Sequence, residues 1–91
     1  MVEFEEFLEL VERDPNPYYM VGEHETSDII DMVLSANDTL TPFEHFAVGA
    51  NIKYLCRLGR KPGASKISDL KKIIDYSQQI IDKIEKEERE T

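Results

Sequence analysis

The segment Thr41–Ser65, TPFEHFAVGANIKYLCRLGRKPGAS, carries the start and stop signals of one complete helix. Thr41 can cap a helix, Pro42 suits the first helical position, and Glu44 stands where a capping box places an acid. Two glycines and a proline interrupt the chain soon after Leu58. The segment therefore predicts a helix that begins at Pro42 and runs to Leu58.

Two stripes of different chemistry follow this predicted helix. The apolar stripe consists of Phe43, Phe46, Ala47, Ala50, Tyr54, Leu55 and Leu58. The basic stripe has Lys53, Arg57 and then Arg60 or Lys61 at four- and three-residue steps. Because residues three and four apart share a helix face, we expect core packing on one side and positive charge on the other.

Helices are also predicted before and after this segment. Thr26 or Ser27 can cap a helix that runs to about Ala36, and Ser65 or Ser68 can start a last helix. The apolar residues of the first are Ile29, Ile30, Val33 and Leu34; the last carries Ile67, Leu70, Ile74, Ser77, Ile81 and Ile84 at the alternating three- and four-residue steps of a short heptad repeat. The charged tail, residues 85–91, is expected to fray.

The N-terminal part adds a fourth helical pattern. Val2–Arg13 is amphipathic and rich in glutamate, and the prolines of Asp14–Pro17 then predict a turn that leads Tyr18, Tyr19 and Met20 into a loop. No segment carries a clear strand pattern. We therefore expect an all-α bundle of about four helices in a single domain over residues 1–91, with the acidic helix within residues 1–14.

Length and composition limit the class of protein. A chain of 91 residues builds a thin core, so assembly into a homo-oligomer, a dimer or a tetramer, is expected. No apolar run approaches the roughly 18 residues of a membrane span, and the start of the chain is acidic rather than basic. The lone Cys56 cannot form an internal disulfide. These features predict an intracellular protein with no membrane partner.

The charges are divided unevenly along the chain. The net charge of −8 combines twelve acids and one base in residues 1–45 with seven bases and one acid in residues 53–72, followed by six acids and three bases. The net charge disfavours nucleic acid as a partner, while the basic segment favours an anionic partner of limited size.

The basic segment has the residue types of a phosphate site. Arg57 and Arg60 can each donate paired hydrogen bonds to phosphate oxygens, and lysines such as Lys53 and Lys61 supply point charges. An aromatic ring such as Tyr54 can stack on a base. Two plainer interpretations stay open: the bases can pair with the acidic N-terminal half, and Tyr54 can be a core residue.

The sequence at these positions resembles a widespread set of small phage proteins long catalogued as a domain of unknown function. The matching residues are Phe46, Gly49, Asn51, Lys53, Tyr54, Arg57, Gly59, Arg60, Lys61, Asp69, Leu70, Lys72 and Tyr76, preceded by Pro17, Tyr18, Tyr19, Glu25, Asp28 and Ile30. The resemblance covers roughly residues 15–84. The chain departs from the pattern at Tyr18, Cys56, Ile73 and Asp75, where many members have histidine, an aromatic residue, alanine and tryptophan.

The resemblance implies nucleotide chemistry in a phage-infected bacterium. A related domain occurs in a phage nucleotide kinase, and small phage proteins of this kind include anti-CBASS sponges that bind cyclic dinucleotide signals. We expect a ligand site formed by Tyr18, Tyr19, Asn51, Lys53, Tyr54, Arg57, Arg60, Lys61, Asp69, Lys72 and Tyr76. Asn51 and Asp69 would read base edges or orient the cations, and Asp69 could instead cap the last helix.

The sequence favours binding over catalysis. It has no P-loop, since Gly59–Ser65 has glycines and a lysine in the wrong order. His24, His45 and Cys56 lack the spacing of a catalytic set, and Glu25, Asp28 and Asp31 are more simply solvated acids than metal ligands. We expect no catalytic residue, metal or cofactor.

Three functions follow from the sequence. The first is sequestration of a cyclic dinucleotide such as 3'3'-cGAMP, without turnover, in the cytoplasm of the infected host, which would block anti-phage defence. The second is a nucleoside monophosphate kinase-like activity. In the third, the glutamates of the N-terminal segment imitate nucleic acid and inhibit a host protein.

Overall fold

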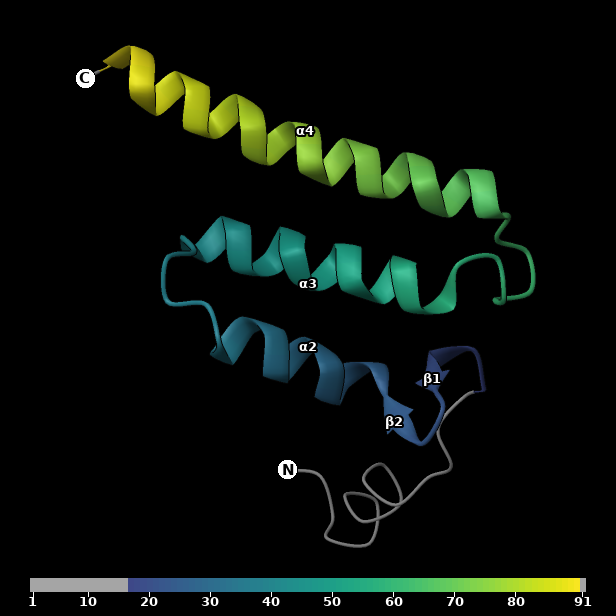
Figure 1. Cartoon of the computed structure of the whole chain (residues 1–91). Helices are drawn as coiled ribbons and strands as arrows, with labels where there is room; N and C mark the ends of the chain where they lie inside the picture. The colour runs from purple at the N-terminus through teal and green to yellow at the C-terminus, as the bar shows by residue number, and fades with distance from the viewer. Residues whose placement is uncertain (1–16, 91) are drawn as a thin grey trace, which may run out of the picture.

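The computed structural model describes residues 17–90, which are mainly helical (Figure 1). The elements are the 3-10 turn η1 (Pro17–Tyr19), the strands β1 (Met20–Val21) and β2 (His24–Glu25), and the helices α2 (Thr26–Ser35), α3 (Pro42–Arg57) and α4 (Lys66–Glu90). The helical class is confirmed, with three α-helices in the described part of the chain. The helix expected within Val2–Arg13 lies outside the described residues.

Helix α3 occupies the middle of the fold. It packs against α4 on one side and against α2 on the other, so the three helices form a layer (Figure 1). Helix α4 is much longer than α3, and its C-terminal turns extend past the beginning of α3 (Figure 1). The short hairpin formed by β1 and β2 lies against the end of α3 that leads to the α3–α4 turn.

The start of α3 confirms the expected cap. The backbone N–H of Glu44 donates a 3.3 Å hydrogen bond to Thr41 Oγ1, and the Thr41 hydroxyl lies 3.0 Å from Glu44 Oε2. Pro42 occupies the first turn, where its missing N–H costs nothing. The helix ends at Arg57, one residue earlier than predicted.

The core is smaller than the apolar stripe of α3 predicts. Ala47 is fully buried, but Phe46 and Leu55 are 60% and 56% exposed, so their assignment to the core is wrong. A helix flanked on two sides by neighbours in one layer keeps two uncovered faces. Phe46 and Leu55 lie on opposite sides of α3, which leaves each on one of these faces.

The segment before α2 differs from the prediction in two respects. Met20 pairs with Glu25 and Val21 with His24 in a short antiparallel hairpin, around a turn in which Gly22 has φ +61°. The sequence shows no strand pattern there, because two-residue strands are too short to have one. The expected capping of α2 by Thr26 or Ser27 is also wrong: Glu25 is the N-cap, without a side-chain cap.

The Thr26 side chain instead connects α2 to η1. Its hydroxyl is buried and donates a 2.7 Å hydrogen bond to the carbonyl oxygen of Tyr19. This bond fixes the position of the Tyr18–Tyr19 pair, whose rings meet edge to face at 4.6 Å.

Helix α4 begins as predicted and ends later. Ser65 Oγ accepts a 3.0 Å hydrogen bond from the Ser68 N–H. The tail expected to fray is helical through Glu90. Its lysines, glutamates and arginine are good helix formers, which explains the continuation. Within residues 17–90, no helix is long and apolar enough to cross a membrane.

Candidate functional site

The α3–α4 turn is fixed by a buried ion pair. Arg57 Nη2, at the end of α3, donates a 3.0 Å hydrogen bond to Asp69 Oδ1 in the first turns of α4. Asp69 Oδ2 accepts a second bond, also of 3.0 Å, from the backbone N–H of Gly59. Both side chains are shielded from solvent, with Arg57 2% and Asp69 0% exposed. One carboxylate thus joins the end of α3, the turn and the beginning of α4.

The two charges of this pair support each other. The Gly59 hydrogen bond, together with Arg57 and Lys72, holds the pKa of Asp69 below its ordinary value although burial acts in the opposite direction. Burial alone would lower the pKa of Arg57, but Asp69 and the Tyr19 phenol outweigh it and raise this pKa. Both groups are therefore charged throughout the neutral pH range.

Asp69 therefore does not cap α4, because Ser65 has that position. Its carboxylate accepts a hydrogen bond from Arg57 instead, which agrees with the suggested role of orienting a cation. The Nε atom of Arg57 is buried and, among the described residues, has no hydrogen-bond partner. A buried donor of this kind ordinarily has an acceptor, such as an ordered water molecule.

The ring of Tyr54 is surrounded by cations. The Arg57 Cζ atom lies 4.8 Å, the Lys72 Nζ atom 5.1 Å and the Lys53 Nζ atom 5.6 Å from the centre of the ring. The Tyr76 ring lies nearly parallel to it, with a centroid distance of 6.3 Å and an interplanar angle of 22°. Half-buried Tyr54 is therefore the centre of a mixed aromatic and basic group.

Two further aromatic residues extend this group. Lys53 Nζ also lies 5.9 Å from the Tyr19 ring centre, and Tyr76 meets Phe46 edge to face at 5.7 Å. We call the basic residues and tyrosines of this group the Tyr54 cluster, which excludes the exposed Phe46: Tyr19, Lys53, Tyr54, Arg57, Lys72 and Tyr76. Its members come from η1, α3 and α4, three segments distant in sequence.

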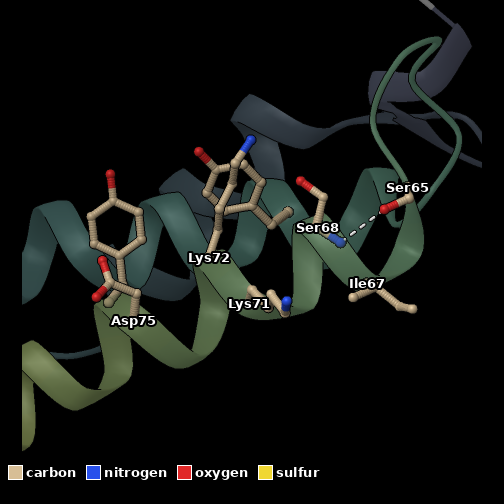
Figure 2. A pocket seen from close by; sticks show the side chains of 8 residues that line it. Ser65, Ile67, Ser68, Lys71, Lys72 and Asp75 are labelled. Carbon is tan, nitrogen blue, oxygen red and sulfur yellow. Dashed lines mark hydrogen bonds between the residues drawn. The ribbon is translucent and has the colours of Figure 1, made fainter.

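An open pocket of about 600 Å³ adjoins the Tyr54 cluster. Figure 2 shows Lys71, Lys72, Ser68 and Asp75 along the first three turns of α4 that border it. The complete lining consists of Tyr54, Ser65, Ile67, Ser68, Lys71, Lys72, Asp75 and Tyr76. Two lysines and two hydroxyl groups therefore face one hollow together with two aromatic rings.

The expected site residues are placed in three groups. Tyr54, Lys72 and Tyr76 line the pocket. Lys53 and Arg57 contact the Tyr54 ring, and through them Tyr19 and Asp69 are connected to it. Tyr18, Asn51, Arg60 and Lys61 are not part of the lining.

Asn51 and Arg60 have structural partners instead. Asn51 Nδ2 donates a 3.1 Å hydrogen bond to Ser77 Oγ on α4, and its Oδ1 atom is buried without a partner among the described residues. Arg60 donates to the carbonyl oxygen of Met20 and so connects the α3–α4 turn to β1.

Five lining residues were absent from the expected site. In the sequence, Ser65 and Ser68 are possible starts of the last helix, Ile67 belongs to its heptad repeat and Asp75 departs from the family pattern, while Lys71 is one of the seven bases of residues 53–72. Their three- and four-residue spacing along α4 places them on one side of that helix, but only its position beside Tyr54 makes that side a pocket. The Asp75 carboxylate accepts a 3.0 Å hydrogen bond from Gln79 Nε2.

The acids considered for metal binding do not form a site. Within residues 17–90, no three histidine, cysteine, aspartate or glutamate side chains are grouped so that they could hold a metal ion. Glu25, Asp28 and Asp31 are all exposed.

The family described as "Protein of unknown function (DUF3310)" matches residues 14–78 of the chain. The chain belongs to this family. The DUF3310 match includes the whole Tyr54 cluster and every residue that lines the pocket, and it ends before the last twelve described residues of α4. Comparisons with curated proteins and with solved structures found no match.

Proposed function

We propose that this protein is a phage-encoded binder that sequesters a cyclic dinucleotide immune signal, such as 3'3'-cGAMP, without chemical turnover. It would act in the cytoplasm of the infected bacterium and block anti-phage defence of the CBASS type. The observation that carries the proposal is the Tyr54 ring, which has three cations within 6 Å of its centre and borders an open pocket.

The pocket supplies groups suited to phosphate. Lys71 and Lys72 are exposed point charges, and Ser65 and Ser68 carry hydroxyl groups that can donate to phosphate oxygens. These residues belong to the beginning of α4, where the helix dipole adds partial positive charge. All three contributions support the binding of an anionic group in this part of the pocket.

Arg57 contributes to the site from the protein interior, where it contacts the Tyr54 ring. Because it is 2% exposed and paired with Asp69, it acts mainly by positioning the Tyr54 ring and by keeping positive potential next to it.

The aromatic residues and Asp75 suit a nucleobase. A ring offers a sequence-independent surface on which a base can stack, and Tyr54 and Tyr76 both border the pocket. The carboxylate of Asp75 can accept a hydrogen bond from an exocyclic amino group or a ribose hydroxyl. The volume of about 600 Å³ lies within the range of small-molecule sites.

The proposal includes assembly into a dimer or tetramer. A twofold-symmetric ligand with two phosphates is matched by two copies of one basic site. Binding without turnover needs only a fixed pocket and enough copies of the protein to exceed the signal.

Calorimetric titration with cyclic dinucleotides and linear mononucleotides, followed by chromatography of the recovered ligand, tests the proposal. We expect tight binding of at least one cyclic dinucleotide, which is recovered intact. Lys72→Glu should weaken this binding by roughly tenfold or more, since it replaces attraction by repulsion next to phosphate. The control is Lys86→Glu, an equally exposed residue of α4 outside the pocket, which should bind like the original protein.

Other results of this experiment favour the alternatives. Conversion of a monophosphate to a diphosphate with ATP and Mg2+ would indicate a kinase-like activity. Absence of binding across all ligands would overturn the proposal and favour an acidic inhibitor of a host protein, whose glutamates fall outside the described residues.

A further inference from the structure

Helix α4 carries an apolar row that the other described segments, from η1 to the α3–α4 turn, leave open. The exposed fractions are 66% for Ile67, 43% for Leu70, 65% for Ile74, 46% for Ile81 and 39% for Ile84. All five lie on one stripe of the helix. A continuous row of large aliphatic side chains in water is typical of a protein interface.

This row is distinct from the side of α4 that packs on α3. Ile73, Tyr76 and Ile80 are half-buried, and Asp69 is fully buried, on the side that contacts α3. The exposed row lies next to this side, because its residues occur at alternating three- and four-residue steps on the neighbouring stripe. Packing on α3 therefore cannot cover it.

We infer that the α4 helix of a second copy of this chain covers the row in antiparallel orientation. Ser77 occupies the position between Ile74 and Ile81 in this row. With Ser77 included, the positions from Ile67 to Ile84 are separated by three, four, three, four and three residues, so the spacing is the same from either end. A twofold axis between positions 74 and 77 places Ile67 opposite Ile84 of the second copy and Leu70 opposite Ile81. Such pairing gives the alternating layers of an antiparallel coiled coil.

The charges beside the row select the antiparallel orientation. Lys66 and Lys71 flank it near the start of α4, and Glu85 and Glu87 flank it near the end, all four exposed. Antiparallel helices bring Lys71 to Glu85 and Lys66 to Glu87 of the other copy. Parallel helices would bring Lys66 to Lys71 instead, which is repulsive, and flanking charges of this kind set orientation in coiled coils.

The last turns of α4 extend beyond its packing on α3. Lys83 Nζ lies 4.8 Å from the Phe43 ring centre, near the beginning of α3, and α4 continues for seven residues beyond this contact to Glu90. Residues 81–90 are all exposed. A second α4 alongside would cover Ile81 and Ile84 in these turns, which α3 leaves exposed.

The inferred interface adjoins the pocket. Ile67 belongs to both the apolar row and the pocket lining. Lys71 also lines the pocket, and it flanks the apolar row. The end of the second copy's α4 would therefore form a wall beside each pocket. The inference itself does not depend on the proposed ligand, since the assembly is measured without any ligand.

Sedimentation equilibrium of the full chain tests the interface. We expect the original protein to sediment with at least twice the 10.6 kDa chain mass at micromolar concentration. Ile74→Glu should weaken association by more than about a hundredfold, because it places a carboxylate in each of the two central layers of the interface. The control is Met32→Glu on α2, where a 58% exposed residue is changed in the same way away from the row.

The inference is overturned if the original protein is monomeric over this range, or if Ile74→Glu associates like Met32→Glu. Circular dichroism of both variants separates loss of association from loss of folding. If Ile74→Glu is unfolded, Ile74→Ser serves as the variant, since Ser77 already occupies one position of the row.

Charge reversal tests the orientation. Lys71→Glu and Glu85→Lys should each weaken association by roughly tenfold, because two symmetric attractions become repulsions. The double variant should regain most of the loss, since the opposite charges face each other again. Weakening by both single variants without recovery in the double variant would overturn the antiparallel pairing while leaving the proposed function untouched.

Discussion

The guanidinium group of Arg57 and the carboxylate of Asp69 lie 3.0 Å apart, and almost no solvent reaches either of them. Asp69 also accepts the Gly59 N–H, so this single side chain sets the angle between α3 and α4. The position of Lys72 beside Tyr54, and with it the pocket, depends on that angle. The stability of the pair is therefore a condition for the proposed site.

Asp69→Asn should destabilise the fold by about 2–3 kcal/mol, because it leaves the buried Arg57 charge without its counter-ion. The nearby solvent of this thin layer of helices keeps the loss at this moderate size. Chemical unfolding followed by circular dichroism measures this change. Asp75→Asn, which alters an exposed carboxylate of the same helix, should change stability by less than about 0.5 kcal/mol. Equal losses of stability in the two variants would show that the buried Arg57–Asp69 pair contributes no more to stability than an exposed carboxylate of α4.

The pH dependence of stability should identify Asp69. Its pKa in the folded chain is lowered, first by the Gly59 hydrogen bond and then by Arg57, so its contribution is fully present above the unfolded value of about 3.9 and is lost as the pH falls through the lower folded value. The difference in unfolding free energy between the original protein and Asp69→Asn should be constant above about pH 5 and should shrink below about pH 4. A difference that stays constant down to pH 2 would contradict the lowered pKa.

Gly59→Ala should cost more stability than Gly63→Ala. Both glycines have positive φ, +73° and +83°, but a Cβ on Gly59 would lie 2.5 Å from Lys66 Cγ, whereas a Cβ on Gly63 would meet nothing within 4 Å. We expect about 1 kcal/mol for Gly63→Ala from backbone strain alone and about 2 kcal/mol for Gly59→Ala. Thermal unfolding compares the two, and a reversed order would mean that Lys66 moves aside freely.

The aromatic character of Tyr54, rather than its hydroxyl group, should matter for ligand affinity. Tyr54→Phe keeps a ring between Arg57 and Lys72, so affinity should change by less than about threefold, while Tyr54→Leu should weaken it by roughly tenfold. Calorimetry with the ligand that binds the original protein measures both. Equal losses in the two variants would point to the hydroxyl group instead.

The sequence predicted much of the local structure, because local signals determine it. The cap formed by Thr41 and the start of α4 at Ser65 depend on bonds between residues three apart in the chain. The hairpin and the absence of a side-chain cap on α2 were not predicted. They depend on the contact of Thr26 with Tyr19, seven residues away, for which the sequence carries no pattern.

The candidate site likewise has some features that local sequence predicts and others that depend on distant contacts. The sequence predicted Tyr54, Lys72 and Tyr76 as ligand residues, partly through a family resemblance. All three line the pocket, and their role in binding stays a prediction. It could not separate Arg57, which is buried against Asp69, from Arg60, which is exposed in the turn. Both are basic residues at helical spacing, and only the partner across the turn distinguishes them.

By itself, the sequence determined that the described part of the chain is mainly helical, where α3 and α4 begin, and that the positive charge is concentrated between residues 53 and 72. These properties follow from hydrogen bonds, helical periodicity and residue type within single segments. The tertiary structure alone decided which charges are buried, which aromatic rings meet and which apolar row of α4 stays open. Those outcomes depend on how α2 and α4 lie on either side of α3, and residues far apart in the chain become neighbours only when the helices pack.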